Sequence, residues 1–248
     1  MIILTIGSIT LYGLLTGVVG TGLGGVLGIF CRRQNAAFLS AILSYAAGTM
    51  LAVVTFSLLP QAFSQASLNL VLSGVAVGVI FLTVLEVWAE QHTRCAADPS
   101  ACGMRHLGIS IAVGIALHNL PEGLAIGSGM QAAPGLGLSL MITILLHDVP
   151  EGLSMAIPLQ KGALSARKAL WLCILSGAPT GLGAFLGAAA GTVSPQVLAF
   201  CLSLAAGAML YVTASDILPQ THHLYPGRIP GAFMILGVIT GMIISICI

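Results

Sequence analysis

Long apolar runs separated by short polar breaks dominate the chain, and this pattern predicts eight helices. Each run has roughly the 20 residues that a helix needs to cross the hydrocarbon core of a bilayer. The breaks contain charged and turn-forming residues, among them Asp98-Pro99-Ser100 and Tyr225-Pro226-Gly227. We therefore expect an all-α integral membrane protein. The predicted helices extend over residues 3–30, 36–60, 68–89, 106–129, 135–158, 168–190, 196–219 and 229–247.

Composition supports the lipid bilayer as the solvent for these helices. Hydrophobic residues make up 57% of the 248 residues and charged residues only 6%, whereas a soluble domain carries roughly 25% charged residues. So few charges leave too little polar surface for a bundle that faces water on all sides. The net charge of +1, with no basic cluster longer than Arg32-Arg33, also argues against nucleic-acid binding.

The basic residues gather on one side of the predicted bundle. All 8 lysines and arginines fall in the connections between helices 1 and 2, 3 and 4, 5 and 6, and 7 and 8. The positive-inside rule places these four connections in the cytoplasm and both termini outside. The residues concerned are Arg32, Arg33, Arg94, Arg105, Lys161, Arg167, Lys168 and Arg228.

Two parts of the chain match each other at one constant shift in residue number. Thr21-Gly22-Leu23-Gly24 returns as Thr180-Gly181-Leu182-Gly183, which sets the shift (180 − 21 = 159), and Leu59-Pro60-Gln61 returns as Leu218-Pro219-Gln220. Predicted helices 1–3 therefore match helices 6–8. Because the shift moves the chain by five spans, an odd number, the second copy is predicted to lie inverted in the membrane.

This internal repeat favours a transporter. Inverted repeats are typical of secondary transporters, whose binding sites lie near the middle of the membrane where the repeats meet. We therefore interpret residues 1–248 as a single transmembrane transporter domain. In this interpretation, residues 3–89 form repeat A, residues 168–247 form repeat B, and residues 106–158 form the two helices between them.

Those two central helices carry a second duplication, with its own constant shift (147 − 118 = 29). His118-Asn119-Leu120-Pro121-Glu122-Gly123 returns as His147-Asp148-Val149-Pro150-Glu151-Gly152. A charged side chain costs about 2.5–3.5 kcal/mol or more at the centre of a membrane helix, and three neighbouring carboxylates would repel one another. A bound dication removes both penalties because its charge offsets two carboxylates. The motif therefore predicts a metal site.

The spacing within each motif suits metal coordination. Positions i and i+4 share one face of a helix, so His118 stacks over Glu122 and His147 over Glu151. Two helices that meet along these faces would supply a four-ligand site of two imidazoles and two carboxylates. Such donors suit zinc, cadmium, iron or manganese, and the motif contains no cysteine that would favour copper(I). The ion would be the substrate rather than a catalytic cofactor.

The remaining polar residues of the motif extend the predicted site. Asn119 and Asp148 point to the adjacent helix face, where they could hold a second ion. Pro121 and Pro150 each lack an N–H, which frees a backbone carbonyl one turn earlier.

Other interpretations of this motif stay open. Its polar side chains could hold helices together or relay protons, and the protein could be a channel or a metal-regulated scaffold. An intramembrane metal-dependent hydrolase is the main alternative to a carrier. Helical zinc proteases, however, use the pattern H-E-x-x-H, whereas Asn119 and Asp148 follow the histidines here. An inverted repeat also serves alternating access and has no evident use in an enzyme.

The paired H-[ND]-x-P-E-G motif, flanked by two three-helix repeats, resembles the ZIP (Zrt/Irt-like) family of metal transporters. The stretch Thr55-Phe56-Ser57-Leu58-Leu59-Pro60 is similar to the prokaryotic GufA-type branch of that family. The resemblance implies a 3+2+3 helix arrangement, import of divalent metal across the plasma (inner) membrane, and an elevator-like slide of the site-bearing helices. It also implies a homodimer as a possible partner state.

Family resemblance assigns roles to individual residues. It implies a primary site of His118, Glu122, His147 and Glu151, with Asn119 and Asp148 in an adjoining site that one glutamate bridges. Met50 and Ser57 match positions of the transport pathway. Thr180 stands where family members often have a glutamate, which removes a charge from the second site.

Weaker signals lie near the predicted cytoplasmic ends of the helices. Asp216 occupies the position of Ser57 in the repeat and could attract cations to a vestibule, whereas Glu86 is expected to reach the interface. The connection between helices 3 and 4 contains four further metal-ligating residues, whose spacing matches no standard zinc module. They are His92, Cys95, Cys102 and His106.

Overall fold

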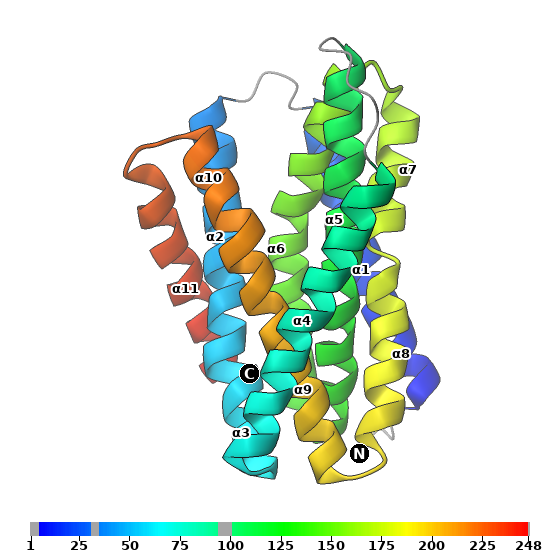
Figure 1. Ribbon diagram of the computed structural model, residues 1–248, viewed down its shortest axis with the longest axis vertical. Coiled ribbons are helices and arrows are strands. Elements are labelled where there is room, and N and C mark those ends of the chain that lie inside the picture. Colours follow the sequence, from blue (N-terminus) through cyan, green and yellow to red (C-terminus); the bar gives the residue numbers. More distant parts are fainter. Residues whose placement is uncertain (1–4, 31–34, 94–100, 248) are drawn as a thin grey trace.

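The computed structural model describes residues 5–30, 35–93 and 101–247, and every regular element among these residues is helical (Figure 1). The elements run roughly along one common axis as a bundle. In chain order they are α1 (Ile6–Phe30), α2 (Ala36–Val53), η1 (Val54–Leu58), α3 (Leu59–Gln65), α4 (Leu68–Thr93), α5 (Ala101–Ala132), α6 (Pro134–Lys161), α7 (Ala166–Ser176), α8 (Pro179–Gly191), α9 (Pro195–Val212), η2 (Thr213–Ile217), α10 (Leu218–Leu224) and α11 (Ile229–Cys247).

Within the described residues, 7 helical spans are long and apolar enough to cross a membrane. Three of them join consecutive elements: α2 to α3, α7 to α8, and α9 to α10. The helix α5, which carries the first H-x-x-x-E motif, packs beside α6 and α8 in the same bundle. The predicted all-helical membrane fold is therefore confirmed. Of the basic residues that predict its orientation, Arg32, Arg33 and Arg94 lie outside the described residues.

Three helices that the sequence predicts as continuous are interrupted. The second and seventh contain the π-helical turns η1 and η2, in which the N–H of Leu59 bonds to the carbonyl of Val54 and that of Leu218 bonds to the carbonyl of Thr213. A proline is the second residue after each turn, and in a regular helix its ring would clash with the carbonyl four residues earlier. The wider π turn accommodates this ring. The sixth predicted helix breaks between α7 and α8, just before Pro179.

The element bounds repeat along the chain. The shift of the sequence repeat, which maps position 21 onto position 180, carries the bounds of α2, η1 and α3 onto those of α9, η2 and α10 without any offset. Packing partners are exchanged in the same way, because α2 packs on α11 while α9 packs on α4. A twofold relation between two copies produces this kind of exchange.

Close helix contacts follow the same relation at single residues. A Cβ atom at Gly48 would collide with the backbone carbonyl of Met234, and one at Gly207 would collide with that of Val75. The two contacts are equivalent under the shift, since 48 corresponds to 207 and 75 to 234. Glycine is needed at both positions because the two helix backbones touch. These contacts support the predicted internal repeat, while its inverted orientation in a membrane stays a prediction.

Helix packing divides the bundle into two groups. The helices α1, α5, α6, α7 and α8 pack on one another and form the site group. The helices α2, α4, α9 and α11, with the short helices that extend them, form the flanking group. A buried apolar cluster that includes Met50, Ile144, Leu202 and Met209 fills the space between the two groups.

Candidate metal centre

The duplicated motif lies in the buried middle of α5 and α6. The four predicted primary ligands are almost inaccessible, with exposed fractions of 6% for His118, 0% for Glu122, 0% for His147 and 2% for Glu151. Pro121 and Pro150 lie inside these helices without ending them. Burial removes water from these four polar side chains, so each needs a hydrogen bond or an oppositely charged partner in its place.

The imidazoles pair with carboxylates of the facing helix. The Nε2 atom of His118 lies 3.2 Å from Oε2 of Glu151, and Nε2 of His147 lies 2.9 Å from Oε1 of Glu122. The sequence predicted stacking within each helix instead. Because α5 and α6 are antiparallel neighbours, their motifs run in opposite directions, and the histidine of one helix comes level with the glutamate of the other.

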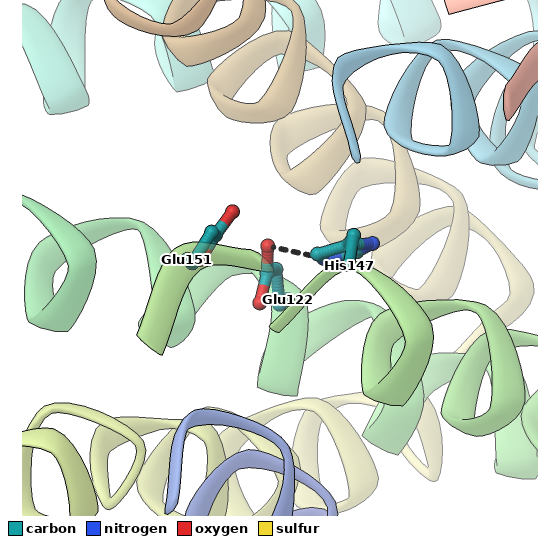
Figure 2. Close-up of side chains that lie close together, drawn as sticks. All are labelled: Glu122, His147 and Glu151. Atoms are coloured by element: carbon teal, nitrogen blue, oxygen red, sulfur yellow. Dashed lines mark hydrogen bonds and ion pairs between the residues drawn. The ribbon is translucent and has the colours of Figure 1, made fainter. Parts of the chain in front are cut away.

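Three of these side chains converge tightly enough to hold an ion. One ligand atom from each of Glu122, His147 and Glu151 lies within 4.8 Å of the others. Figure 2 shows them side by side, with the ion pair between Glu122 and His147 dashed. Ligand atoms of a tetrahedral zinc site lie about 3.3 Å apart, as bond lengths near 2.0 Å require. A small inward movement would bring these three ligand atoms to that spacing, and His118 contacts one of the three residues, Glu151.

Each of the four side chains keeps one buried atom without a hydrogen-bond partner. These atoms are Nδ1 of His118, Nδ1 of His147, Oε2 of Glu122 and Oε1 of Glu151. A buried polar atom left unpaired costs about 1–3 kcal/mol, so this concentration of unpaired atoms in one place is expensive in the protein alone. A divalent cation would satisfy both carboxylates at once.

Asp148 and Asn119 lie beside this centre. The Oδ1 atom of Asp148 is 3.6 Å from Nε2 of His147, and neither carboxylate oxygen has a hydrogen-bond partner. Asn119 donates from Nδ2 to the backbone carbonyl of Ser176 over 2.7 Å, which leaves its Oδ1 unpaired. Asp148 therefore adds carboxylate oxygens next to His147, while Asn119 follows His118 on α5 and keeps one amide oxygen unpaired.

The break between α7 and α8 explains how Asn119 is held. The N–H of Thr180 bonds to the carbonyl of Gly177 rather than to that of Ser176. The Ser176 carbonyl is thereby free of its helical donor and accepts from Asn119. The hydroxyl of Thr180 is fully buried and has no partner, at the position where a family glutamate was expected.

A cavity of about 390 Å³ leads away from the centre. His118 and Glu151 lie at its inner end, and Asp216 and Gln220 lie along η2 and α10. The cavity therefore extends toward the upper end of the bundle in Figure 1, where α6 ends and α7 and α11 begin. The basic residues of the described connections are at that end. Its other lining residues are Leu43, Ile111, Gly114, Ile115, Ser154, Ser215 and Ile217.

Two predicted pathway residues lie away from this cavity. Met50 is fully buried, with its sulfur 4.0 Å from the hydroxyl of Thr213. The Ser57 hydroxyl donates to that of Ser245 over 2.8 Å. Asp216, by contrast, lines the cavity as the vestibule hypothesis expected.

Sequence reasoning missed the setting of Glu86. Its carboxyl group lies near Asp216 and the Tyr211 hydroxyl rather than facing the membrane interface alone. The repeat contained the missing signal, because its shift maps Ser57 to Asp216 and Glu86 to Ser245. The predicted loop residues His92, Cys95, Cys102 and His106 lie outside the part of the chain whose side chains the structure describes.

Comparisons with known proteins agree with this geometry. The model of a family described as ZIP Zinc transporter matches residues 87–248. A protein named Zinc transporter ZupT from Chlorobium limicola is 32% identical over 240 residues, covering 89% of this chain and 90% of its own. Another of that name, from Chlorobium luteolum, is 35% identical over 251 residues, with 90% of both chains covered. A Zinc transporter GufA from Myxococcus xanthus is 34% identical over 154 residues, 61% of each chain.

Proposed function

The chain belongs to the ZIP zinc transporter family, and on this premise we propose that it carries divalent metal ions, zinc foremost, through the centre between α5 and α6. The observation that carries this proposal is the buried convergence of Glu122, His147 and Glu151 within 4.8 Å inside a membrane-type bundle. Charged ligands at such depth are costly unless an ion meets them. The ion is the cargo of the protein.

Import into the cytoplasm is the direction we propose. The cavity supports it, because it joins His118 and Glu151 to the end of the bundle where the basic residues lie. Packed apolar side chains close the centre on the other side, among them Leu140 and Ile144, both fully buried. A site open to one end at a time is what alternating access requires. We further propose the plasma (inner) membrane, with both termini outside.

The donor types support a preference for transition metals. Two imidazoles and two carboxylates suit zinc and cadmium, and also iron or manganese. The oxygen donors of Asn119 and Asp148 extend the same site, and we propose that they contribute to a second, weaker ion position. Thr180 offers only a neutral hydroxyl there, which lowers the charge available to that ion.

The alternative of a metal-dependent hydrolase gains nothing from the geometry. A hydrolytic zinc site keeps an open position for water and places a general base beside it. Here both glutamates are engaged with imidazoles, and family membership favours transport. A homodimer, which the resemblance implies, stays a proposal for the oligomeric state.

Uptake into liposomes tests the proposed function. The purified protein is reconstituted, and zinc or cadmium entry is followed with a dye inside the vesicles. We expect uptake by the wild type and none by a His118→Ala/Glu151→Ala variant. A Thr10→Ala/Thr192→Ala variant serves as the control, because these hydroxyls bond only to carbonyls of their own helical segments.

Two outcomes would contradict the proposal. Equal uptake by the wild type and the His118→Ala/Glu151→Ala variant would defeat the site assignment. Failure of the wild type to move any divalent ion, together with peptidase activity, would favour the hydrolase.

A further inference from the structure

Two apolar crevices lie along the seam between the site group and the flanking group. The large crevice has a volume of about 450 Å³ and lies between α1 and α6 on one side and α2 and α11 on the other. The small crevice, of about 160 Å³, lies between α5 and α8 on one side and α4 and α9 on the other. Among the described residues that line the two crevices, only Tyr45 carries a polar side-chain group.

The two crevices occupy equivalent places in the internal repeats. The shift that maps His118 onto His147 relates three lining residues of α5 to three of α6, and the shift of the three-helix repeats relates α1 and α2 to α8 and α9. The equivalent pairs are Val149 and Leu120, Pro150 and Pro121, Leu153 and Leu124, Leu27 and Leu186, and Tyr45 and Leu204. The repeats therefore form the same crevice twice, and the copy on α6 is the wider one.

The large crevice and the metal cavity share two walls. On α2, Leu43 lines the 390 Å³ cavity while its neighbour Ile42 lines the crevice. On α6, Glu151 lines the cavity while its neighbour Pro150 lines the crevice. The contact between α2 and α6 thus has the metal path on one face and the crevice on the other. A movement of these two helices that closes the cavity therefore changes the shape of the crevice as well.

The equivalent contact, between α9 and α5, is closed on both faces. Leu202 and Glu122, which are the equivalents of Leu43 and Glu151, are fully buried. The crevice on this contact is the small one. One separation between the site group and the flanking group therefore accounts for both the open cavity and the wide crevice.

The large crevice opens on a surface that lipid covers. Leu27, Phe38 and Leu236 line it and are exposed, and they belong to helices long and apolar enough to cross a membrane. An apolar cavity of about 150 Å³ accepts one benzene molecule. The large crevice has about three times that volume, so it has room for much of a lipid acyl chain.

A lysine beyond the crevice indicates which kind of lipid fits. Leu153, Ile157 and Lys161 are spaced four residues apart and share one face of α6. Ile157 and Lys161, together with Gln160 and with Gly28 of α1, line a further pocket of about 280 Å³. Lys161 lies about 12 Å beyond Leu153, since a helix rises 1.5 Å per residue. Basic pockets between membrane helices bind the anionic headgroups of lipids.

We propose that an anionic phospholipid binds here, with its phosphate at Lys161 and one acyl chain in the large crevice, and that it stabilises the state in which the metal cavity is open. The second half of this inference rests on the proposed transport function. A ligand that fits one of two states shifts the equilibrium toward that state. The equivalent place offers no such site, because Ala132 stands at the position of Lys161 and the small crevice is too narrow for the chain.

Native mass spectrometry of the purified full-length protein with added phosphatidylglycerol tests the binding. Ile42→Trp fills the crevice and Lys161→Gln removes the charge, so each should weaken lipid binding about fivefold or more. The matched controls are Leu72→Trp, at a lipid-exposed position of α4, and Lys168→Gln, an exposed lysine of α7. Both should bind as the wild type does. Leu236→Trp replaces Ile42→Trp if that variant elutes as an aggregate.

Thiol reactivity tests whether the lipid stabilises the open cavity. Gly114 lines the cavity, so a Gly114→Cys variant in a background without the native cysteines reports its access to a polar thiol reagent. Phosphatidylglycerol added to the protein in detergent should speed this reaction about threefold or more, and Ile42→Trp should abolish the response. Glycerol phosphate, which has the charge and no acyl chain, should leave the rate unchanged.

The outcomes separate this inference from the proposed function. Lipid binding that neither Ile42→Trp nor Lys161→Gln weakens would show that the site is wrong. Lipid binding without any change in the reactivity of Gly114→Cys would overturn the stabilisation of the open state. Neither measurement uses a metal ion, so a wild type that moves no ion into liposomes would defeat the proposed function and leave the lipid site standing.

Discussion

The two ends of the His/Glu centre are built from equivalent positions, yet one end is open and the other is packed. At the open end, Gly114 and Ile115 of α5 line the cavity. Their counterparts on α6, under the shift that maps His118 onto His147, are Thr143 and Ile144, which are fully buried. Equivalent positions in the same local frame thus have different surroundings. A repeat fixes which residues can line a path, and the packing between the site group and the flanking group decides which set does so.

Chemistry separates the two ends further. The open end carries the acidic pair Glu86 and Asp216, and the packed end carries the hydroxyl pair Ser57 and Ser245. Carboxylates attract a dication and hydroxyls do not hold it. Under the proposed function, the shared backbone frame supports motion in both directions, whereas the acidic pair makes the two directions unequal for a metal ion.

The largest expected effect on zinc uptake comes from removing ligands of the His/Glu centre that both ends share. Each of the variants His118→Ala/Glu151→Ala and Glu122→Ala/His147→Ala should lower zinc uptake by about 100-fold or more, since losing two ligands costs several kcal/mol of ion binding. Dye-based uptake in liposomes measures this. A variant of one pair that keeps most of the activity while the other loses it would show that the two ends do not share one centre.

The second prediction moves the acidic pair to the packed end. Ser57 is 5% exposed and Ser245 is partly buried, so the variant Ser57→Asp/Ser245→Glu places one buried and one partly buried carboxylate side by side and should destabilise the protein by about 3 kcal/mol or more. Thermal unfolding in detergent measures the loss. The Ser57→Ala/Ser245→Ala control loses one hydrogen bond, which is worth about 1 kcal/mol. If the acidic variant unfolded at the same temperature as the wild type, the end that contains Ser57 would not be packed as described.

The third prediction compares access to equivalent positions. A Cβ atom at Gly114 would meet no neighbour within 4 Å, whereas Thr143 is fully buried. In a background with the 6 native cysteines replaced, Gly114→Cys should react with a polar thiol reagent at least about tenfold faster than Thr143→Cys, because reaction needs an accessible thiolate. Zinc that occupies the cavity should slow the first reaction. Equal rates would mean that the two ends are alike in the resting protein.

The smallest effect concerns the acidic pair at its own end. The variant Glu86→Ser/Asp216→Ser should slow uptake by about three- to tenfold, because the charges that concentrate cations in the cavity are lost. The wild-type advantage should shrink as salt is added, since mobile ions screen such fields. Initial rates at two ionic strengths provide the measurement. A difference that salt leaves unchanged would point to altered packing instead.

Local sequence patterns predicted the helices and the ligand types, and tertiary placement supplied the rest. The i, i+4 spacing brought His118 and Glu122 to one face, but the distances show that His118 pairs with Glu151. Which carboxylate an imidazole meets depends on how α5 and α6 are offset, and no local pattern encodes that offset. The pairing of Ser57 with Ser245 likewise depends on the packing of α2 against α11.

The interruptions that the helix prediction missed lie next to prolines in the sequence. Pro179 marks the break between α7 and α8, and Pro60 and Pro219 are each the second residue after a π turn. Apolar periodicity ignores such positions, because a membrane helix tolerates proline where neighbouring groups satisfy the freed carbonyls. The break near Pro179 was also what oriented Asn119, through Ser176.

The π turn η2 sets the rotational orientation of α10, the helix that continues directly from it. A residue advances an α-helix by about 100°, and a π turn contains one residue more than the α-helical turn it replaces. Removing a single residue from η2 would tighten this turn toward α-helical spacing and rotate α10 by about that angle. Gln220 would then leave the cavity wall, and the carbonyl of Thr221 would turn away from the hydroxyl of Ser40, which donates to it over 2.7 Å. The extra residue in η2, rather than the identity of any side chain, thus orients α10 so that Gln220 lines the cavity.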